Sequence, residues 1–516
     1  MMSTNRSERL KNLSPEKRAL LLKALGKEAI QAEQSKRIPR RSQQNYAPLS
    51  FPQQRLWFFD RLSPENPAYN LPAAVRLQGQ LNLSALQQTL NEIVRRHEIL
   101  RTAFAEVDGQ PVQLISPSLD FALSVVNLRH LPETEQQAEI EQRTLEEAQR
   151  PFDLTRSPLL RGTLLQLSPA EYVLLLTIHH IISDGWSMGV LVREVAALYK
   201  AFSSDKPSGL PELPVQYADF ASWQRQHFQG EKLEKQLAYW KQQLGGALAL
   251  LSTDRPRSPV QTFRGSQQSF VISSPLTDKL KTLAQQQDVT LFMTLLAVFQ
   301  SLLYCHIKQD NLAIGSPIAN RNRLELEELI GFFVNTLVLR IDTAGNPTFR
   351  ELLRRTREVA LAAYTHPDVP FEKLVEELQP ERNLSYNPLF QVWFVLQNAP
   401  MPPLELAGLT LSLLEFDVGM SKHDLSLTFW EVSGGIQGLF DYKTDLFEAA
   451  TIARMVRGFQ TLLNQVVIQP DMRLDDLAEI IAEAERQHQI EQEKQIHISG
   501  IQKLKMAKRK VMKSLK

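Results

Sequence analysis

The chain has 516 residues, a net charge of +1, 43% hydrophobic residues and 22% charged residues. This length predicts two or more domains or one large two-lobed unit, and the composition is that of a folded globular protein. The balanced charge excludes a basic footprint for nucleic acid over the chain as a whole. The single cysteine, Cys305, excludes an internal disulfide and a cysteine-cluster zinc site, and it suits a reducing cytoplasm.

The first 45 residues are polar and charged, and we expect an N-terminal helical extension or linker there. Ser14, Pro15 and Glu16 read as an N-cap, a first-turn proline and a first-turn acid in front of the run KRALLLKAL. No signal peptide is visible in this segment. A globular pattern begins at about Tyr46 and predicts an N-terminal lobe over residues 46–214.

Within this lobe, residues 172–178 (YVLLLTI) form a nearly continuous apolar run that predicts a strand buried on both faces. Apolar residues at helical spacing follow Trp186, and Ser187 stands where a helix N-cap is expected. Residues 179–185 therefore form a loop between a buried strand and an amphipathic helix, where catalytic groups are often displayed.

The stretch 203–214 (SSDKPSGLPELP) has three prolines and no hydrophobic period, and it predicts the boundary between two lobes. The C-terminal lobe, residues 215–480, mixes helical patterns with the apolar strands LAIGSPI, TLVLRID and FQVWFVLQ. Residues 289–307 lack charged side chains, but their polar residues favour a buried core helix over a membrane span. Residues 481–516 form a basic C-terminal tail or linker.

Three kinds of chemistry are possible at this loop. Residues 185–189 (GWSMG) match the G-x-S-x-G pattern of serine hydrolases, but a nucleophile elbow needs its serine directly after a strand, whereas several loop residues precede Ser187. A metal site at His180 and Asp184 lacks the third protein ligand that catalytic zinc requires. The third possibility is a histidine that accepts a proton from a bound substrate near neutral pH.

Seven segments then point to one family. The sequence HHIISDG at residues 179–185 matches the HHxxxDG motif of the condensation domains of nonribosomal peptide synthetases. The other motifs resemble those of the same family and occur in the expected order: SFPQQRLWFFDRL (50–62), RHEILRTAF (96–104), YADFASWQ (217–224), IGFFVNTLVLR (330–340), HPDVPFEKLVEEL (366–378) and RNLSYNPLFQVWFVLQN (382–398). The departures Pro52, Asn383 and His423 lie outside the central motif.

The resemblance implies a mixed α/β (α+β sandwich) fold of two lobes, each similar to a chloramphenicol acetyltransferase protomer, which meet in a V with the site at their junction. It implies that an acceptor aminoacyl amine attacks a donor acyl or peptidyl thioester to form an amide. His180 would act as the base or would orient the amine, and both roles remain open at this stage. Gly185 would admit the reacting carbonyl and could stabilise the oxyanion through its N–H.

Further roles follow from the resemblance. Asp184 is implied to be structural and paired with an arginine of the second motif, for which we favour Arg101 over Arg96. His179 would support the loop. Substrate-tunnel positions are predicted for Trp186, Ser187 and Asn335.

The partners implied are donor and acceptor carrier proteins, whose phosphopantetheine arms present the substrates, and adjacent synthetase modules. No cofactor or metal of its own, no nucleic acid and no membrane are expected, and the expected location is cytoplasmic. The wording of the motifs favours donors of L configuration. Two alternatives are retained: a catalytically silent platform for carrier proteins, and a serine hydrolase that uses Ser187.

Overall fold

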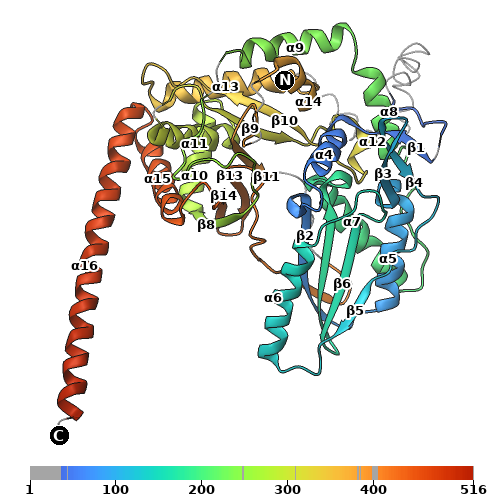
Figure 1. Cartoon of the computed structure of the whole chain (residues 1–516), viewed down its shortest axis with the longest axis horizontal. Coiled ribbons are helices and arrows are strands. Elements are labelled where there is room, and N and C mark those ends of the chain that lie inside the picture. Colours follow the sequence, from blue (N-terminus) through green and yellow to red (C-terminus); the bar gives the residue numbers. More distant parts are fainter. Residues whose placement is uncertain are drawn as a thin grey trace.

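The computed structural model describes residues 37–514 except residues 44, 247–248, 308, 381–382, 384 and 398–404. Two lobes lie side by side in Figure 1, each built from a twisted sheet with helices packed against it. The mixed α/β fold in two lobes confirms the predicted fold class. The helix predicted around Ser14 lies outside the described residues.

The N-terminal lobe holds a five-stranded sheet in the order β12-β2-β7-β6-β5 and a three-stranded sheet in the order β1-β4-β3. Its strands are β1 (Tyr46–Pro48), β2 (Asn70–Gly79), β3 (Thr102–Val107), β4 (Gln110–Ile115), β5 (Ser124–Asn127), β6 (Leu160–Ser168) and β7 (Glu171–His179). Its helices are α4 (Phe51–Leu62), α5 (Leu83–Arg96), α6 (Glu133–Gln149), α7 (Gly185–Phe202) and α8 (Tyr217–His227), with the short 3-10 helices η1 (Pro67–Tyr69), η2 (Glu98–Arg101) and η3 (His180–Ile182).

The C-terminal lobe is built on a six-stranded sheet in the order β10-β9-β11-β13-β14-β8. The strands of this half of the chain are β8 (Gly265–Ser273), β9 (Ala313–Ile318), β10 (Asn335–Arg340), β11 (Val392–Gln397), β12 (Leu409–Leu413), β13 (Leu425–Val432) and β14 (Gly435–Lys443). Its helices are α9 (Glu231–Leu244), α10 (Ser274–Gln286), α11 (Leu291–Ile307), α12 (Leu324–Glu327), α13 (Phe349–Tyr364), α14 (Phe371–Leu378), α15 (Ala449–Ile468) and α16 (Leu474–Ser514). The three predicted strands are confirmed as β9, β10 and β11.

The predicted buried strand is confirmed as β7, which is paired on one side with β2 and on the other with β6. Its side chains alternate between two apolar clusters. Leu174, Leu176 and Ile178 pack in the cluster that includes α5 and α7, whereas Val173 and Leu175 pack in the cluster that includes α6. Burial on both faces fixes this strand, and therefore the position of the histidines that follow it.

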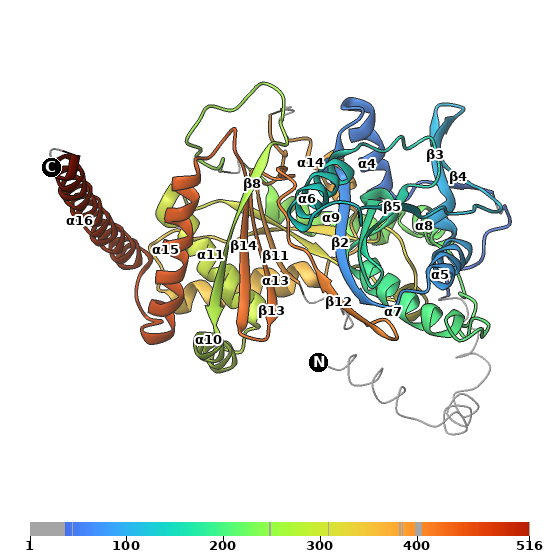
Figure 2. The ribbon, with the colours of Figure 1, turned by 90° about the horizontal axis from the view of Figure 1, so that it is seen from below.

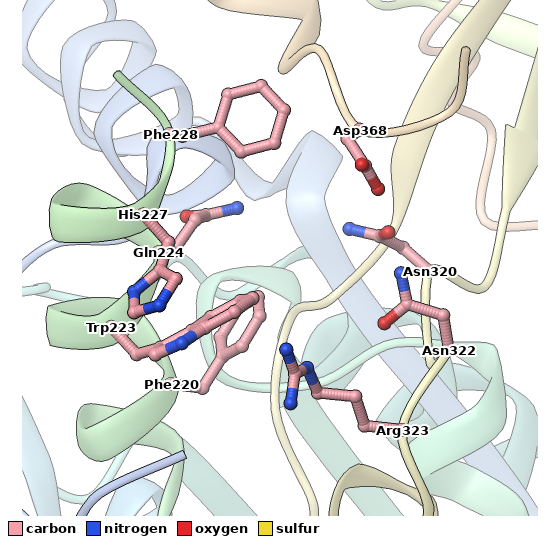
Figure 3. A pocket seen from close by; sticks show the side chains of 9 residues that line it. All are labelled: Phe220, Trp223, Gln224, His227, Phe228, Asn320, Asn322, Arg323 and Asp368. Atoms are coloured by element: carbon pink, nitrogen blue, oxygen red, sulfur yellow. The ribbon is translucent and has the colours of Figure 1, made fainter. Parts of the chain in front are cut away.

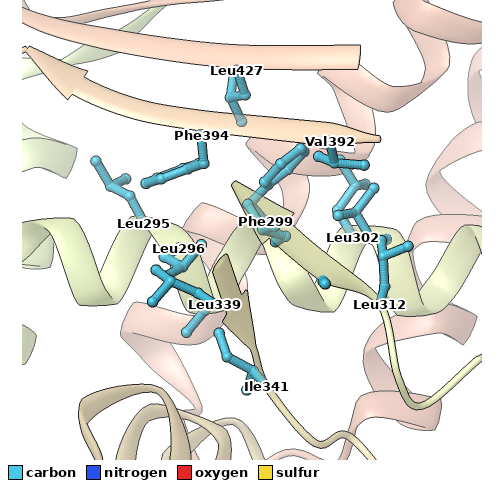
Figure 4. Packing of buried hydrophobic residues seen from close by; sticks show 14 of the residues in the cluster. Leu295, Leu296, Phe299, Leu302, Leu312, Leu339, Ile341, Val392, Phe394 and Leu427 are labelled. Carbon is cyan, nitrogen blue, oxygen red and sulfur yellow. The ribbon is translucent and has the colours of Figure 1, made fainter. Parts of the chain in front are cut away.

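The charge-free run that raised the question of a membrane span is the core helix α11. Figure 4 shows Leu295, Leu296 and Phe299 packed against strands of the C-terminal sheet, and the ring of Phe299 lies 5.7 Å from that of Phe394. No single helix in the described part of the chain is long and apolar enough to cross a membrane, and the pair α10 and α11, which would meet this test together, is bent by 102°.

The lobes exchange segments, so the proline-rich stretch at 203–214 marks a turn in the chain and not the division between the two cores. Helix α8 follows this stretch, yet Tyr217 and Phe220 pack in the N-terminal core. Strand β12 returns from the second half of the chain and pairs with β2, which Figure 2 shows beside it. The exchanged segments tie the two halves of the chain together, and β12 does so at the end of β2 opposite to Asn70, the residue that pairs with His179.

The described end of the predicted N-terminal extension also belongs to the N-terminal lobe. Ile38 is 4% exposed in its core, and the guanidinium of Arg41 pairs with Glu98 at 2.5 Å and with Asp219 at 2.8 Å. Since Asp219 lies on α8, this segment fastens α8 to the lobe. The extension predicted to reach residue 45 is therefore packed structure from Ile38 onward.

The basic tail continues a helix that starts in the core. Helix α16 is 41 residues long and projects away from the body of the molecule in Figure 1. Its first turns are anchored, because Leu474 and Leu477 are 0% exposed and Glu485 pairs with Arg457 at 2.8 Å.

We predict that a chain ending at Glu485 keeps the melting temperature of the full chain, since it retains the anchoring turns of α16. A chain ending at Arg473 loses both buried leucines, each worth about 1.5–3 kcal/mol of burial, and should melt at a clearly lower temperature. Thermal unfolding followed by circular dichroism measures both. Equal melting temperatures for the two truncations would show that α16 contributes nothing to the core.

Candidate active site

The HHxxxDG loop connects the end of β7 to the start of α7. His179 is the last residue of β7, His180 opens the 3-10 helix η3, and Gly185 is the first residue of α7. The backbone N–H of Ser183 bonds to the carbonyl of His180 and closes this turn. The two histidines and the N-terminus of α7 are therefore held within one short, hydrogen-bonded connection.

Asp184 is the N-cap of α7 and the centre of the loop's hydrogen bonds. Its Oδ1 accepts the backbone N–H of Ser187 at 2.8 Å and Arg321 Nη2 at 3.1 Å, and its Oδ2 accepts the backbone N–H of Phe333 at 3.0 Å. The carboxylate is 0% exposed. Since Phe333 and Arg321 come from the second half of the chain, one side chain caps the helix and binds the segment 321–333 of that half.

The ion-pair partner of Asp184 is Arg321, so the predicted pairing with Arg101 is wrong. Arg101 donates to the carbonyl of Ser116 and lies 3.9 Å from Glu98, whereas the rejected alternative Arg96 pairs with Glu194 at 3.0 Å.

Further contacts fix the position of the Arg321 guanidinium. Its Nη1 donates to the carbonyls of Leu326 and Leu329, and its guanidinium lies 4.1 Å from the ring centroid of Phe333. Burial lowers the pKa of Arg321, but arginine is so basic that the pair stays charged.

Ser187 is buried inside this network, so two interpretations of it are wrong. It lies in the first turn of α7 and does not cap the helix, because Asp184 does. Its hydroxyl accepts from Arg321 Nη2 at 2.9 Å and from the N–H of Gly331 at 3.0 Å, and it lies 2.7 Å from Asp184 Oδ1 and 2.9 Å from the carbonyl of Gly331. At 0% exposure, with its lone pairs and its hydrogen occupied, it is no nucleophile for an external substrate.

At Gly331 the segment 321–333 lies very close to Tyr217 of helix α8. A Cβ atom at this position would lie 2.0 Å from Cδ2 of Tyr217, so only glycine fits there. The Tyr217 hydroxyl in turn donates to the carbonyl of Phe332 at 2.6 Å.

His179 points inward and supports the loop. It is 5% exposed, and its Nδ1 accepts the backbone N–H of Ile181 at 3.1 Å. Burial, together with the positive charges of Lys422 and Arg161, lowers the pKa of His179 to about 3. It is therefore a neutral residue at physiological pH.

His180 differs from His179 in both orientation and accessibility. It is partly exposed, and its Nδ1 lies 2.7 Å from the carbonyl of Ser183, to which it must donate. The neutral ring then carries its only proton on Nδ1, and Nε2 keeps a free lone pair. Burial lowers the pKa of His180 well below its usual range, and the charge of Lys422 lowers it further. The ring centroid of Phe332 lies 4.8 Å from that of His180, so Phe332 packs against this histidine.

Gly185 is exposed beside this histidine. A Cβ atom there would meet nothing nearer than Gln397 Oε1 at 4.0 Å, so no protein atom demands glycine at this point. The open space lies at the positive end of the α7 dipole, where the first N–H groups of a helix have no partner within the helix.

The side chains of Trp186 and Asn335 form hydrogen bonds with backbone groups. Trp186 Nε1 donates to the carbonyl of Glu327 at 2.9 Å. Asn335 Nδ2 donates to the carbonyls of Pro367 and Val369, and its Oδ1 accepts from two backbone N–H groups, so its amide has no capacity left for a substrate. The structure therefore does not bring the predicted tunnel residue Asn335 into the site.

Four residues that sequence reasoning missed belong to the site: Arg321, Phe332, Gln397 and Lys422. Only Phe332 and Gln397 lay in segments that resembled the family. No pattern in the sequence distinguishes Arg321 or Lys422 among the 58 lysines and arginines of the chain.

A separate pocket of about 380 Å³ lies between α8 and the loops that follow β9 and precede α14. Figure 3 shows Trp223 and His227 on one wall and Asn320, Asn322 and Asp368 on the other. Arg323 lies over the ring of Trp223 at 4.4 Å. None of the site residues predicted from the sequence lines this pocket.

The sequence pattern of the condensation domain matches residues 43–490. The chain belongs to the condensation domain family. One of the linear gramicidin synthase proteins of Brevibacillus parabrevis is 49% identical over 454 residues, which cover 87% of this chain and 6% of that protein. Chondramide synthase cmdD of Chondromyces crocatus is 48% identical over 437 residues, covering 84% of this chain and 11% of that protein. This condensation domain thus spans a small part of the length of these two relatives.

Solved structures agree with this assignment. The X-domain from teicoplanin biosynthesis superposes with a TM-score of 0.79 at 29% identity, covering 85% of this chain and 99% of that one. A four-domain nonribosomal peptide synthetase bound to AMP and glycine gives a TM-score of 0.74 at 26% identity, covering 86% of this chain and 34% of that one. The condensation domain fold predicted from the motifs is confirmed.

We predict that Ser187→Ala lowers the free energy of unfolding by about 1–3 kcal/mol, because it leaves the N–H of Gly331 and part of Arg321 buried without a partner. Ser183→Ala is the matched control: Ser183 is also 0% exposed, but among the residues that the structure describes its hydroxyl donates to Met188 Sδ alone, at 4.0 Å. Chemical denaturation of both variants measures the difference. Equal losses would mean that the network around Ser187 does not stabilise the lobe junction.

Proposed function

We propose that this condensation domain forms an amide bond between two substrates that carrier proteins present as thioesters. The observation that carries the proposal is the state of His180: a partly exposed, neutral imidazole with Nε2 free, beside the exposed N-terminus of α7 at Gly185. A proton acceptor beside the positive end of a helix dipole suits an acyl transfer reaction.

Amide formation needs both the proton acceptor and the helix N-terminus. An α-amine has a pKa of about 7.7–8, so much of it is protonated near neutral pH, and it must also lose a proton as its nitrogen bonds to the thioester carbon. The nitrogen–carbon bond forms, the carbon–sulfur bond breaks, and the thiolate of the donor carrier leaves. His180 Nε2 accepts the amine proton, which then returns to the departing sulfur.

The role of Gly185 is to stabilise the carbonyl oxygen of the donor thioester. During attack this oxygen becomes negatively charged, and the first N–H groups of α7 lie at the positive end of the helix dipole. The absence of a side chain leaves room for the thioester beside Gln397. His180 and Gly185 are thus the two catalytic residues, and Asp184 and His179 position them.

The partners follow from the chemistry and from the relatives. We propose donor and acceptor carrier proteins as partners, with phosphopantetheine arms as the groups that reach His180, and adjacent synthetase modules as the source of loaded carriers. No cofactor of its own enters this mechanism. A cytoplasmic location accords with the single cysteine.

A second candidate function has one observation in its favour. The teicoplanin X-domain, which has a similar fold, also forms a complex with OxyB, so a chain of this fold can serve as a platform for another protein. The intact loop geometry here supports catalysis instead, because a platform needs neither a free Nε2 nor an open helix N-terminus. The serine hydrolase alternative is excluded by the burial of Ser187.

We predict that His180→Ala reduces amide formation about 10²–10⁴-fold while the melting temperature stays within a few degrees of the parent, since His180 accepts the proton whereas Asp184 and His179 hold the loop. The assay is the mass of the product on the acceptor carrier in a single turnover, with both carriers loaded from a panel of aminoacyl thioesters. His130→Ala is the matched control, because His130 is an exposed histidine outside the site.

Two results would contradict the proposal. Product formation at the parental rate by His180→Ala would remove the histidine from the chemistry. Absence of product with every loaded carrier pair in the parent, together with stable carrier binding, would favour the platform.

A further inference from the structure

Strand β11 brings one side chain of the C-terminal lobe to the HHxxxDG loop. Gln397, the last residue of β11, is exposed, and its Oε1 lies 4.0 Å from the position that a Cβ atom would take on Gly185. Among the residues that the structure describes, none forms a hydrogen bond with the side-chain amide of Gln397. This amide therefore faces the space in which the proposed function places the donor thioester.

Gln397 shares one face of the C-terminal sheet with Trp430. Side chains alternate between the two faces of a strand. Val392 and Phe394 of β11 and Leu427 of β13 lie on the side of α11, in the core cluster that Figure 4 shows. The register pairs Gln397 with Trp430 of β13, so both of these side chains lie on the opposite face, turned away from α11.

Trp430 is a partly exposed tryptophan that the protein itself does not use. It belongs to none of the hydrophobic clusters, and no described residue stacks on its ring, places a cation over it or bonds to its N–H. Each of the other five of the six tryptophans has such a contact. A large apolar ring beside a free amide is the combination that lines small-molecule sites.

The surface formed by Gln397 and Trp430 is neutral. The nearest acid on the same face of β11, β13 and β14 is Asp441, which the register places level with Trp393. Four residues separate Trp393 from Gln397, or about 13 Å along the strand. A free ammonium is held best by a carboxylate, whereas a side-chain amide offers both a donor and an acceptor and so matches a peptide group.

We propose that Gln397 and Trp430 form the subsite for the donor residue of the condensation reaction. Gln397 binds the amide at the α-carbon of the donor, and the ring of Trp430 covers the donor side chain. The inference rests on the proposed function, in which Gly185 holds the thioester carbonyl. The α-nitrogen is two bonds from that carbonyl carbon, within reach of an amide that lies over Gly185. Peptidyl or N-acyl donors with an apolar side chain are therefore favoured over donors with a free amine.

The test compares two donors that differ by one acetyl group: leucyl and N-acetyl-leucyl thioesters on the same donor carrier, with one acceptor, in a single turnover. The parent should prefer the acetylated donor. Gln397→Ala should slow the acetylated donor about tenfold, the effect of losing neutral hydrogen bonds, and should leave the leucyl donor nearly unchanged. Gln110→Ala, at an exposed glutamine of β4, is the matched control and should change neither rate.

A second measurement needs no turnover. N-acetyl-leucyl pantetheine, made inert by a methylene group in place of the thioester sulfur, is titrated into the full chain. The side-chain amide signals of Gln397, assigned by their loss in Gln397→Ala, should shift in the NMR spectrum of the parent, and this variant should bind the analogue about tenfold more weakly. Trp430→Ala should weaken binding of the leucyl analogue more than that of the matching glycyl analogue.

The inference is overturned if Gln397→Ala slows both donors equally or slows neither. It is also overturned if the analogue does not bind at millimolar concentration, or saturates the chain without moving the Gln397 signals. Gln397→Asn, whose amide is drawn back from Gly185, replaces Gln397→Ala if the latter does not fold. Because the titration needs no turnover, a chain that binds the analogue through Gln397 but forms no amide would contradict the proposed function alone.

Discussion

The buried carboxylate of Asp184 is the constraint on which the site depends. It caps α7, receives the guanidinium of Arg321 and accepts the backbone N–H of Phe333. These contacts join the end of the central strand of one lobe to a segment supplied by the other half of the chain. Because a fully buried charge is tolerated only when it is paired and hydrogen-bonded, the loop and the segment must take up their positions together.

Within nine residues, 179–187, this constraint separates the side chains that hold the structure from those proposed to take part in the chemistry. Asp184, Ser187 and His179 have their polar atoms directed into the protein, and they hold the turn rigid. His180 and Gly185 lie between them in sequence but open outward, with a free Nε2 on one and an unhindered backbone on the other. Preorganisation of this kind suits the reaction of a thioester, which is already activated and gains most from being placed correctly.

The elements around the site could be predicted because local patterns determine them. The apolar run at 172–178 has one interpretation when it is flanked by polar residues, and the strands β9, β10 and β11 follow from the same rule. His180 and Gly185 could be singled out from the spacing of the HHxxxDG motif. The motif order also predicted the family.

The contacts between residues that are distant in the sequence could not be predicted. Asp184 and Arg321 are separated by 137 residues, and nothing local shows which arginine a buried aspartate will meet. Asp184 and Ser187 are both favoured N-cap residues, and only the exact start of α7 decides between them. The proline-rich stretch at 203–214 marks a turn, but the exchange of β12 between lobes depends on sheet pairing far along the chain.

The central claim is that His180 presents an unprotonated Nε2 to the substrates. The most direct measurement is the ¹⁵N chemical shifts of its two ring nitrogens at pH 7, assigned among the 10 histidines by comparison with His180→Ala. The account predicts a neutral ring protonated on Nδ1, with Nε2 at the shift of an unprotonated nitrogen. A ring protonated on Nε2, or an imidazolium at this pH, would contradict it.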